Sequence, residues 1–134
     1  NNPSDDGKST AVFSKLGVEF HSVDKDGKSI ENAKRACGKG VIFHQADGRE
    51  FLKGFKKKID FLYLDGGNDP KETWEQFRAA PLSPDAIIVV DDCMLHNGNP
   101  YGKGTIIVEK GIPHYLTGYF GKYRSLIIGG EKWK

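Results

Sequence analysis

Two adjacent carboxylates, Asp91 and Asp92, directly follow the apolar run "AIIVV" at residues 86–90. Other acidic residues follow β-rich runs in the same way, namely Asp24, Asp47 and Asp65. In an open α/β sheet, ligands bind outside the carboxyl ends of the strands, so these side chains are expected to line one crevice. Removing a carboxylate from water is costly unless hydroxyl donors, backbone amides or a cation stabilise it. The spacing therefore predicts a polar binding site at this edge.

Each of these acids also has a purely structural interpretation. Aspartate between a strand and a helix is a favoured helix N-cap, and for Asp24 and Asp47, each taken singly, the cap and the binding role are equally favoured. Asp91 and Asp92 are harder to explain as caps, because one helix start uses one cap. For that pair the alternative is two separate sets of hydrogen-bond partners, and the sequence leaves both interpretations open.

The predicted strands and helices alternate along the chain, and the acidic residues named above follow the strands. Short runs rich in β-branched and aromatic residues predict strands at residues 18–23, 41–45, 59–64 and 86–90. Segments with apolar residues three or four apart predict helices at residues 29–37, 49–57 and 70–80. This order is typical of βαβ units, so we expect an α/β fold with a mostly parallel sheet.

The C-terminal part has a different pattern. Two β-rich runs flank Gly121 and Lys122, and a Gly-X pair suits a type II′ turn, so residues 115–128 are predicted to form an antiparallel hairpin. The stretch "GKGTIIVEKG" at residues 102–111 is ambiguous. Its β-branched residues favour a strand, whereas its place in the alternation favours a crossover helix, and we predict the helix.

Composition limits the class of protein. The chain has 134 residues, of which 37% are hydrophobic and 28% charged, which predicts one globular domain over residues 1–134. A net charge of +2 is too close to balance to predict a nucleic-acid partner, and the basic residues 53–58 are interpreted as a solvated helix end. No apolar run approaches the roughly 18 residues of a membrane span. Cys37 and Cys93 lack metal-type spacing, which predicts reduced thiols in a cytoplasmic protein.

These segments together resemble the class I S-adenosylmethionine (SAM)-dependent methyltransferases over nearly the whole chain. "VEFHSVDKD" resembles the second strand of that fold, which implies that Asp24 binds the ribose hydroxyls. "VIFHQADGREFL" resembles the third strand and the turn after it, which implies that Asp47 and Gly48 lie near the adenine. "DGKSTAVFSKLG" resembles the start of the first helix and implies further cofactor contacts from Gly7, Ser9 and Thr10.

The most specific segment is "IDFLYLDGGNDPKETWEQFRAAPLSPDAIIVVDD". It resembles the macrocin-type sugar O-methyltransferases and, less closely, the catechol-type enzymes. The resemblance implies a Rossmann-like methyltransferase fold in which Asp65, Asp91 and Asp92 hold a divalent cation, with Asp65 also near the cofactor. Carboxylate oxygens are the hard ligands that Mg²⁺ prefers, so the assignment is chemically consistent.

Two departures from the family bear on function. The glycine-rich first strand of the fold is not found in this sequence and is expected upstream of it. The position three residues after Asp65 is Asn68, which cannot accept a proton, so Lys71 and His96 are the candidate general bases. The resemblance implies SAM-dependent methyl transfer to a hydroxyl group of a small molecule, assisted by a divalent metal. The alternative is a non-catalytic binding or structural module with the same fold.

Overall fold

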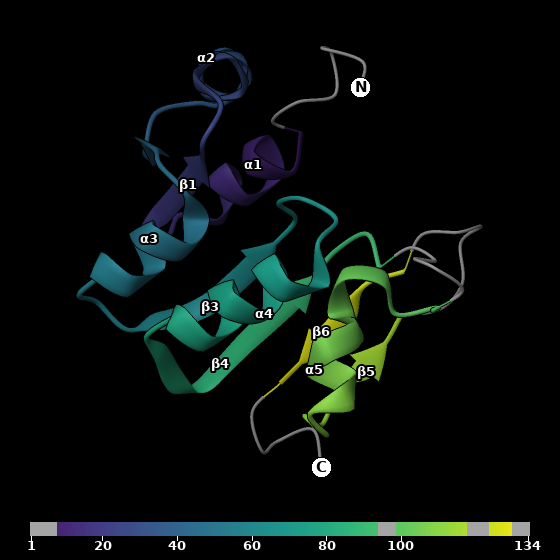
Figure 1. The fold of residues 1–134 in the computed structure, drawn as a ribbon. Helices are drawn as coiled ribbons and strands as arrows, with labels where there is room; N and C mark the ends of the chain where they lie inside the picture. Colours follow the sequence, from purple (N-terminus) through teal and green to yellow (C-terminus); the bar gives the residue numbers. More distant parts are fainter. Residues whose placement is uncertain (1–7, 94–98, 118–123, 130–134) are drawn as a thin grey trace. The chain divides into compact units, whose positions relative to one another are not determined.

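The computed structural model describes residues 8–93, 99–117 and 124–129, and the chain divides into two compact units (Figure 1). The N-terminal unit is Asn1–Phe51 and the C-terminal unit is Leu52–Lys134. Strands and helices alternate along both units, which confirms the predicted α/β class. Within the described residues, no helix is long and apolar enough to cross a membrane. The single domain over residues 1–134 stays a prediction.

The N-terminal unit is built around two parallel strands. Its elements in order are α1 (Lys8–Phe13), the 3₁₀ turn η1 (Ser14–Leu16), β1 (Phe20–Asp24), α2 (Gly27–Ala36), β2 (Val41–Gln45) and the start of α3 (Gly48–Gly54). The pairing of β1 with β2 runs from Phe20↔Val41 to Asp24↔Gln45. Helix α2 buries Ile30 and Ala33, which are three residues apart and therefore lie on one helix face.

The C-terminal unit contains a four-stranded mixed sheet. Its elements after α3 are β3 (Ile59–Leu64), α4 (Pro70–Ala79), β4 (Leu82–Val90), the 3₁₀ turn η2 (Gly102–Gly104), α5 (Thr105–Glu109), β5 (Tyr115–Leu116) and β6 (Leu126–Ile128). The strand order is β3-β4-β6-β5, with β3 and β4 parallel and β6 antiparallel to both of its neighbours. The predicted antiparallel hairpin is confirmed by β5 and β6, while its turn at Gly121 and Lys122 lies outside the described residues.

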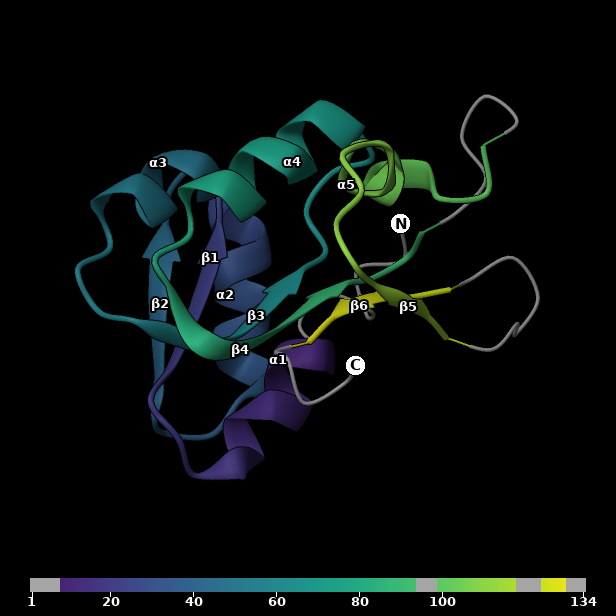
Figure 2. The same cartoon turned by 90° about the horizontal axis from the view of Figure 1, so that it is seen from below.

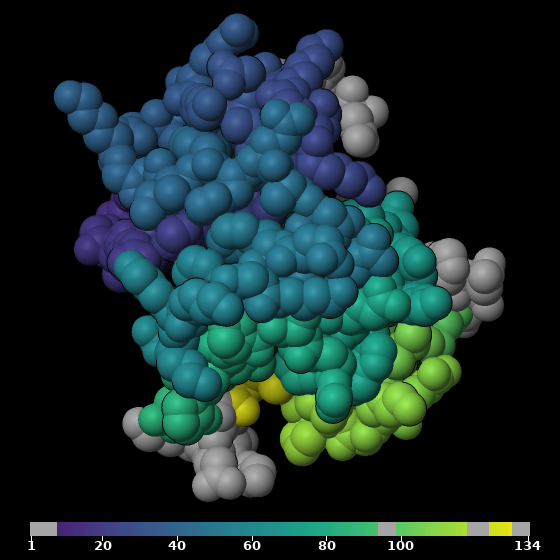
Figure 3. All heavy atoms as spheres, turned by 60° about the vertical axis from the view of Figure 1, so that its left-hand side comes forward, coloured from purple at the N-terminus to yellow at the C-terminus, as the bar shows by residue number. Residues whose placement is uncertain are grey.

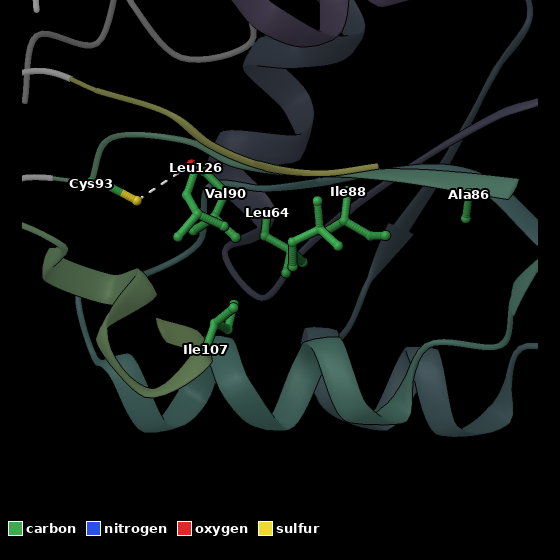
Figure 4. Packing of buried hydrophobic residues seen from close by; sticks show 8 residues of the cluster. Leu64, Ala86, Ile88, Val90, Cys93, Ile107 and Leu126 are labelled. Atoms are coloured by element: carbon green, nitrogen blue, oxygen red, sulfur yellow. Dashed lines mark hydrogen bonds between the residues drawn. The ribbon is translucent and has the colours of Figure 1, made fainter. Parts of the chain in front are cut away.

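The core of this unit lies between the sheet and its two helices. Helices α4 and α5 cover the same face of the sheet (Figure 2), and their atoms adjoin at the surface, α4 in teal-green and α5 in lime (Figure 3). Ala86, Ile88 and Val90 alternate along β4 with a period of two and are buried on that face. Ile107 of α5 and Leu126 of β6 are fully buried in the same cluster (Figure 4).

The predicted boundaries differ from the observed ones most at β4 and at the end of α3, which stops at Gly54 rather than at residue 57. Strand β4 begins at Leu82 rather than at residue 86, because its first residue pairs with Ile59 before the register shifts to Phe61↔Ile87. Pro84 and Asp85 fall inside that shift, and proline lacks the N–H that a regular ladder needs. Strand β1 begins at residue 20 rather than 18. The ambiguous stretch at residues 102–111 is helical, as predicted.

Candidate functional site

Two of the predicted acids lie at matched ends of adjacent strands. Leu64, the last residue of β3, pairs with Val90, the last residue of β4. The next residues along the chain are Asp65 and Asp91, and the backbone N–H of Asp91 donates to the carbonyl of Leu64 at 2.9 Å. The structure therefore brings these two carboxylates together at the carboxyl end of the C-terminal sheet, as the strand pattern predicted.

Hydroxyl groups stabilise the carboxylate of Asp91. The hydroxyl of Tyr63 donates to its Oδ2, and the hydroxyl of Ser125 donates to its Oδ1 at 2.6 Å. Burial on its own would raise the pKa of Asp91, but the hydrogen bonds from Ser125 and Tyr63 outweigh burial and lower it. Burial, reinforced by the bond to Asp91, strongly raises the pKa of Tyr63 and keeps this phenol a donor.

Asp65 is paired with a lysine that the sequence did not single out. The ammonium Nζ of Lys103 lies 3.2 Å from Oδ1 of Asp65 and 3.3 Å from its backbone oxygen. The Lys103 side chain is only 2% exposed, whereas that of Asp65 is 49% exposed. Burial raises the pKa of Asp65, and the nearby Lys103 charge opposes this effect. A lysine flanked by glycines ahead of an apolar run was the available signal, but it does not reveal which strand end the lysine meets.

A tight turn places Lys103 at this edge. Gly102 has a φ of +44°, a conformation that glycine adopts without strain. A Cβ atom at Gly104 would lie 3.0 Å from Cδ1 of Leu126 and 3.4 Å from Sγ of Cys93, so only glycine lets the turn approach the core this closely. Thr105 closes the turn by donating from Oγ1 to the carbonyl of Gly102 at 2.6 Å.

Asp92 has an unusual backbone and an unsatisfied side-chain atom. Its φ is +55°, in the left-handed region that non-glycine residues seldom adopt. Its Oδ1 is buried and has no hydrogen-bond partner among the described residues. Leaving a buried carboxylate oxygen unpaired is costly, so this atom is the one feature of the acid cluster that favours an additional cation or donor.

In the N-terminal unit, Asp24 ends β1 but is not a helix cap. Its Oδ1 accepts from the backbone N–H of Asp26 at 2.8 Å, and Asp26 is the N-cap of α2 through Lys28 N–H at 3.0 Å. The hydrogen bond from the backbone N–H of Lys28, followed by that from the Ser29 hydroxyl, lowers the pKa of Asp26. The N-cap explanation of Asp24 is therefore wrong, and its carboxylate remains exposed at the strand end.

Asp47, by contrast, has the geometry of a cap. Its Oδ1 accepts from the backbone N–H of Arg49 at 2.9 Å and of Glu50 at 3.4 Å, at the start of α3. The guanidinium of Arg49 also binds this carboxylate, with Nη2 3.1 Å from Oδ2. The side-chain bond from Arg49 is the main reason that the pKa of Asp47 falls to about 2. The cofactor roles of Asp47 and of its neighbour Gly48 stay predictions.

The remaining predicted residues are placed as follows. Ser9 and Thr10 lie in α1 and are partly buried. Lys71 is the second residue of α4, where its backbone N–H donates to the N-cap Asp69 at 2.9 Å and its side chain is exposed. Gly7 and His96 lie outside the described residues. The roles of all five stay predictions.

Two histidines in the N-terminal unit are also in contact. Nδ1 of His21 and Nε2 of His44 are 2.9 Å apart, and the two rings are stacked with centroids 5.2 Å apart. The ring of Phe51 lies against His44 at 4.5 Å, and Glu19 binds the far nitrogen of His21 at 2.8 Å. Burial, followed by the charge of His21, lowers the pKa of His44.

The donor set fits a divalent cation poorly. Within residues 8–93, 99–117 and 124–129, no group of three or more His, Cys, Asp or Glu side chains is arranged to hold a metal ion. Both oxygens of Asp91 accept from hydroxyl groups, and Oδ1 of Asp65 accepts from an ammonium. Only the unpaired oxygen of Asp92 favours a cation. The predicted metal on Asp65, Asp91 and Asp92 therefore competes with partners that the chain itself supplies.

Comparison with known proteins decides the family. A family model described as a methyltransferase domain matches residues 4–93, which is more than half of the chain. The chain belongs to this methyltransferase family. The match ends at Cys93, so Lys103 and Ser125 lie beyond it. No curated protein matches the sequence.

Solved methyltransferases share the fold. A candidate rRNA methylase from Clostridium thermocellum superposes with a TM-score of 0.74 at 17% identity, over 92% of this chain and 80% of its own. An O-methyltransferase from Bacillus cereus, in complex with S-adenosylhomocysteine (SAH), gives 0.67 at 14% identity, over 94% and 70%. The O-methyltransferase TomG from Streptomyces achromogenes, of tomaymycin synthesis and in complex with SAM, gives 0.65 at 15% identity, over 93% and 69%. The Rossmann-like, class I SAM-dependent methyltransferase fold is confirmed.

Proposed function

We propose that this methyltransferase transfers the methyl group of SAM to a hydroxyl oxygen of a small molecule. The observation that carries the proposal is the alignment of Asp65 and Asp91 at the carboxyl ends of β3 and β4, in a chain of the methyltransferase family. Carboxylates at this edge are suited to accept hydrogen bonds from hydroxyl groups. Two solved proteins of the same fold are O-methyltransferases that hold SAH or SAM, which supports the same class of reaction.

In the proposed complex the N-terminal unit supplies cofactor contacts. Asp24 is the residue that we assign to the ribose hydroxyls, because its exposed carboxylate ends β1 while Asp26 takes over the capping of α2. The assignments of Asp47 and Gly48 to the adenine, and of Gly7, Ser9 and Thr10 to the rest of the cofactor, rest on the sequence resemblance.

The reaction would be a single displacement at carbon. The acceptor oxygen forms a bond to the methyl carbon while the bond from that carbon to sulfur breaks, which gives a methyl ether and SAH. The hydroxyl proton leaves to a base, for which Lys71 and His96 are the candidates. Tyr63 is a poor candidate, because its raised pKa keeps the phenol protonated and its O–H donates to Asp91.

A second acceptor class is favoured by one comparison. The candidate rRNA methylase is among the matched solved structures, and the basic residues 56–58 after α3 are exposed. RNA should therefore be tested beside small hydroxylated molecules, although the sequence predicts no nucleic-acid partner. The predicted cytoplasmic location rests on the two free thiols, Cys37 and Cys93.

Calorimetric titration with SAM is the first test, followed by a methyl-transfer assay on catechols, sugars and RNA. We expect SAM to bind, and Asp24→Asn to weaken binding by about tenfold or more, since a hydrogen bond to a charged group contributes on the order of 1.5–3 kcal/mol. Asp85→Asn, at an exposed position of β4, is the matched control and should bind like the wild type. Binding without transfer to any acceptor would favour the non-catalytic module. A folded protein that does not bind SAM would refute the proposal.

A further inference from the structure

Lys103 is a buried cation that neither the family match nor the predicted site includes. Lysine is almost never fully buried unless it is paired, because an ammonium group loses its hydration there. Here the pairing is supplied by the carboxylate and the backbone carbonyl of Asp65, at 3.2 and 3.3 Å. Lys103, whose side chain is 2% exposed, is held by the turn η2, in which Gly104 allows the close approach to Leu126 and Cys93.

The charge of Lys103 reaches further than its direct partner. Besides Asp65, it stabilises the ionised form of Asp91, whose own oxygens are bound by Ser125 and Tyr63. The carboxylates of Asp65 and Asp91 therefore share one fixed ammonium and two hydroxyl donors. A divalent cation bound to Oδ1 of Asp65 would compete with the ammonium of Lys103, which has little access to water, and at Asp91 it would have to share each oxygen with a hydroxyl donor.

We propose that Lys103 is the fixed counter-cation of the carboxylates that follow β3 and β4, and that it positions Asp65 so that the site works without a divalent metal. Lys103 is thus a positioning residue: its ammonium orients an acid of the site and does not itself need to touch the acceptor. The part of this inference that concerns cofactor binding rests on the proposed methyl-transfer function, whereas the part that concerns metal binding does not.

The test is a titration of Mg²⁺ followed by SAM in four proteins: the wild type, Lys103→Met, Asp91→Asn/Asp92→Asn and Lys110→Met. Methionine keeps the apolar length of the buried lysine stem while removing its charge, so Lys103→Met preserves most of the packing. Lys110 is the matched control, because it is an exposed lysine directly after α5. Calorimetry reports binding, and the melting temperature with EDTA or with Mg²⁺ reports stabilisation by metal.

For the wild type and for Lys110→Met we expect no saturable Mg²⁺ binding, no change of melting temperature with Mg²⁺, and equal SAM affinity in EDTA and in Mg²⁺. Lys103→Met leaves the carboxylates without their counter-cation. In EDTA we expect it to bind SAM at least about tenfold more weakly, the effect of losing one charged hydrogen bond. We also expect it to gain Mg²⁺ binding and a higher melting temperature in Mg²⁺.

Saturable Mg²⁺ binding by the wild type that is lost in Asp91→Asn/Asp92→Asn would overturn the proposal, and so would a Lys103→Met protein that behaves like Lys110→Met in both titrations. If Lys103→Met does not fold, the Mg²⁺ titration of the wild type still tests whether the site binds a metal. The variant Asp65→Asn then removes the same ion pair through its exposed partner. If no protein binds SAM, the proposed function fails, while the metal titrations still test the role of Lys103.

Discussion

At the scale of single residues, Asp91 shows how a buried strand can end in a carboxylate. Val90, directly before it, is fully buried, yet both oxygens of Asp91 have hydroxyl donors from Tyr63 and Ser125. Hydrogen bonds to an ionised group are stronger than those between neutral groups, and they replace the water that burial removes. The ammonium of Lys103 then supplies the positive charge that two neighbouring carboxylates need.

The bond from Ser125 to Asp91 gives the first stability prediction. Ser125→Ala removes a 2.6 Å hydrogen bond to a half-buried carboxylate, and we expect a loss of about 1–2 kcal/mol in the free energy of unfolding near neutral pH. A lowered carboxyl pKa contributes stability above its unfolded value of 3.8 that disappears as the pH falls through the folded value. The difference between variant and wild type should therefore shrink toward pH 3 in urea unfolding. Ser83→Ala on β4 is the control.

The histidine pair predicts acid sensitivity of the N-terminal unit. The pKa of His44 is lowered from 6.5 in the folded protein, so the unfolded chain binds more protons below that pH and folding is penalised there. His44→Phe keeps a ring against Phe51 and removes the titration, so we expect a smaller fall in melting temperature between pH 7 and pH 5. His114→Phe, at an exposed site, should keep the wild-type fall. An equal effect of both variants would contradict the assignment.

At the scale of elements, the turn η2 determines where α5 and its lysine lie. Gly104→Ala would place a Cβ 3.0 Å from Leu126 and 3.4 Å from Cys93, so the turn or its neighbours must shift. Overpacking of this kind costs about 1–3 kcal/mol, and we expect that loss in chemical unfolding together with weaker SAM binding, since Lys103 is carried by the same turn. Gly54→Ala, where the added methyl meets nothing within 4 Å, is the control and should leave both quantities unchanged.

The elements that the sequence predicted well are those whose apolar pattern is local. Strands β2 and β3 have the predicted bounds. Helix α4 begins at the predicted residue, because Asp69 and Pro70 mark its start, and it ends one residue before the predicted end. Strand β4 was predicted too short, since its first residues pair through an irregular register that only the partner strand reveals. Residues 105–109 form a helix although their β-branched composition favours a strand, because the packing of Ile107 on the sheet overrides that preference.

The site was predictable only in part, because the sequence pattern reveals local elements and not the contacts between distant ones. Asp65 and Asp91 follow strands, so parallel pairing alone brings them together. Lys103 lies 38 residues after Asp65, and Ser125 lies 34 residues after Asp91, so their contacts depend on how η2 and β6 return to the sheet. The periodicity of apolar residues reveals local elements and does not reveal contacts between residues so far apart in the sequence. The structural alternative for the Asp91–Asp92 pair, separate hydrogen-bond partners, therefore describes Asp91 better than the sequence suggested.

At the scale of the whole molecule, the two units differ in the size of their cores. Eight buried residues form one cluster in the C-terminal unit, whereas Ile30 and Ala33 are the buried apolar residues described in the N-terminal unit. Amides exchange slowly where buried apolar contacts are dense. We expect hydrogen exchange monitored by mass spectrometry to show clearly slower exchange in β4 and β6 than in β1 and β2. Equal protection of all four strands would show that the units open together.

The two cysteines provide a chemical readout of this difference. Cys93 is 1% exposed, its Sγ is 3.5 Å from the carbonyl of Val90, and burial raises its pKa. Cys37 follows α2 in the other unit and is partly exposed. A maleimide should therefore label Cys37 in the native protein and reach Cys93 only when the C-terminal core opens. The time between the first and the second mass increase then measures how fast the C-terminal core opens, with the natural cysteines as the only probes.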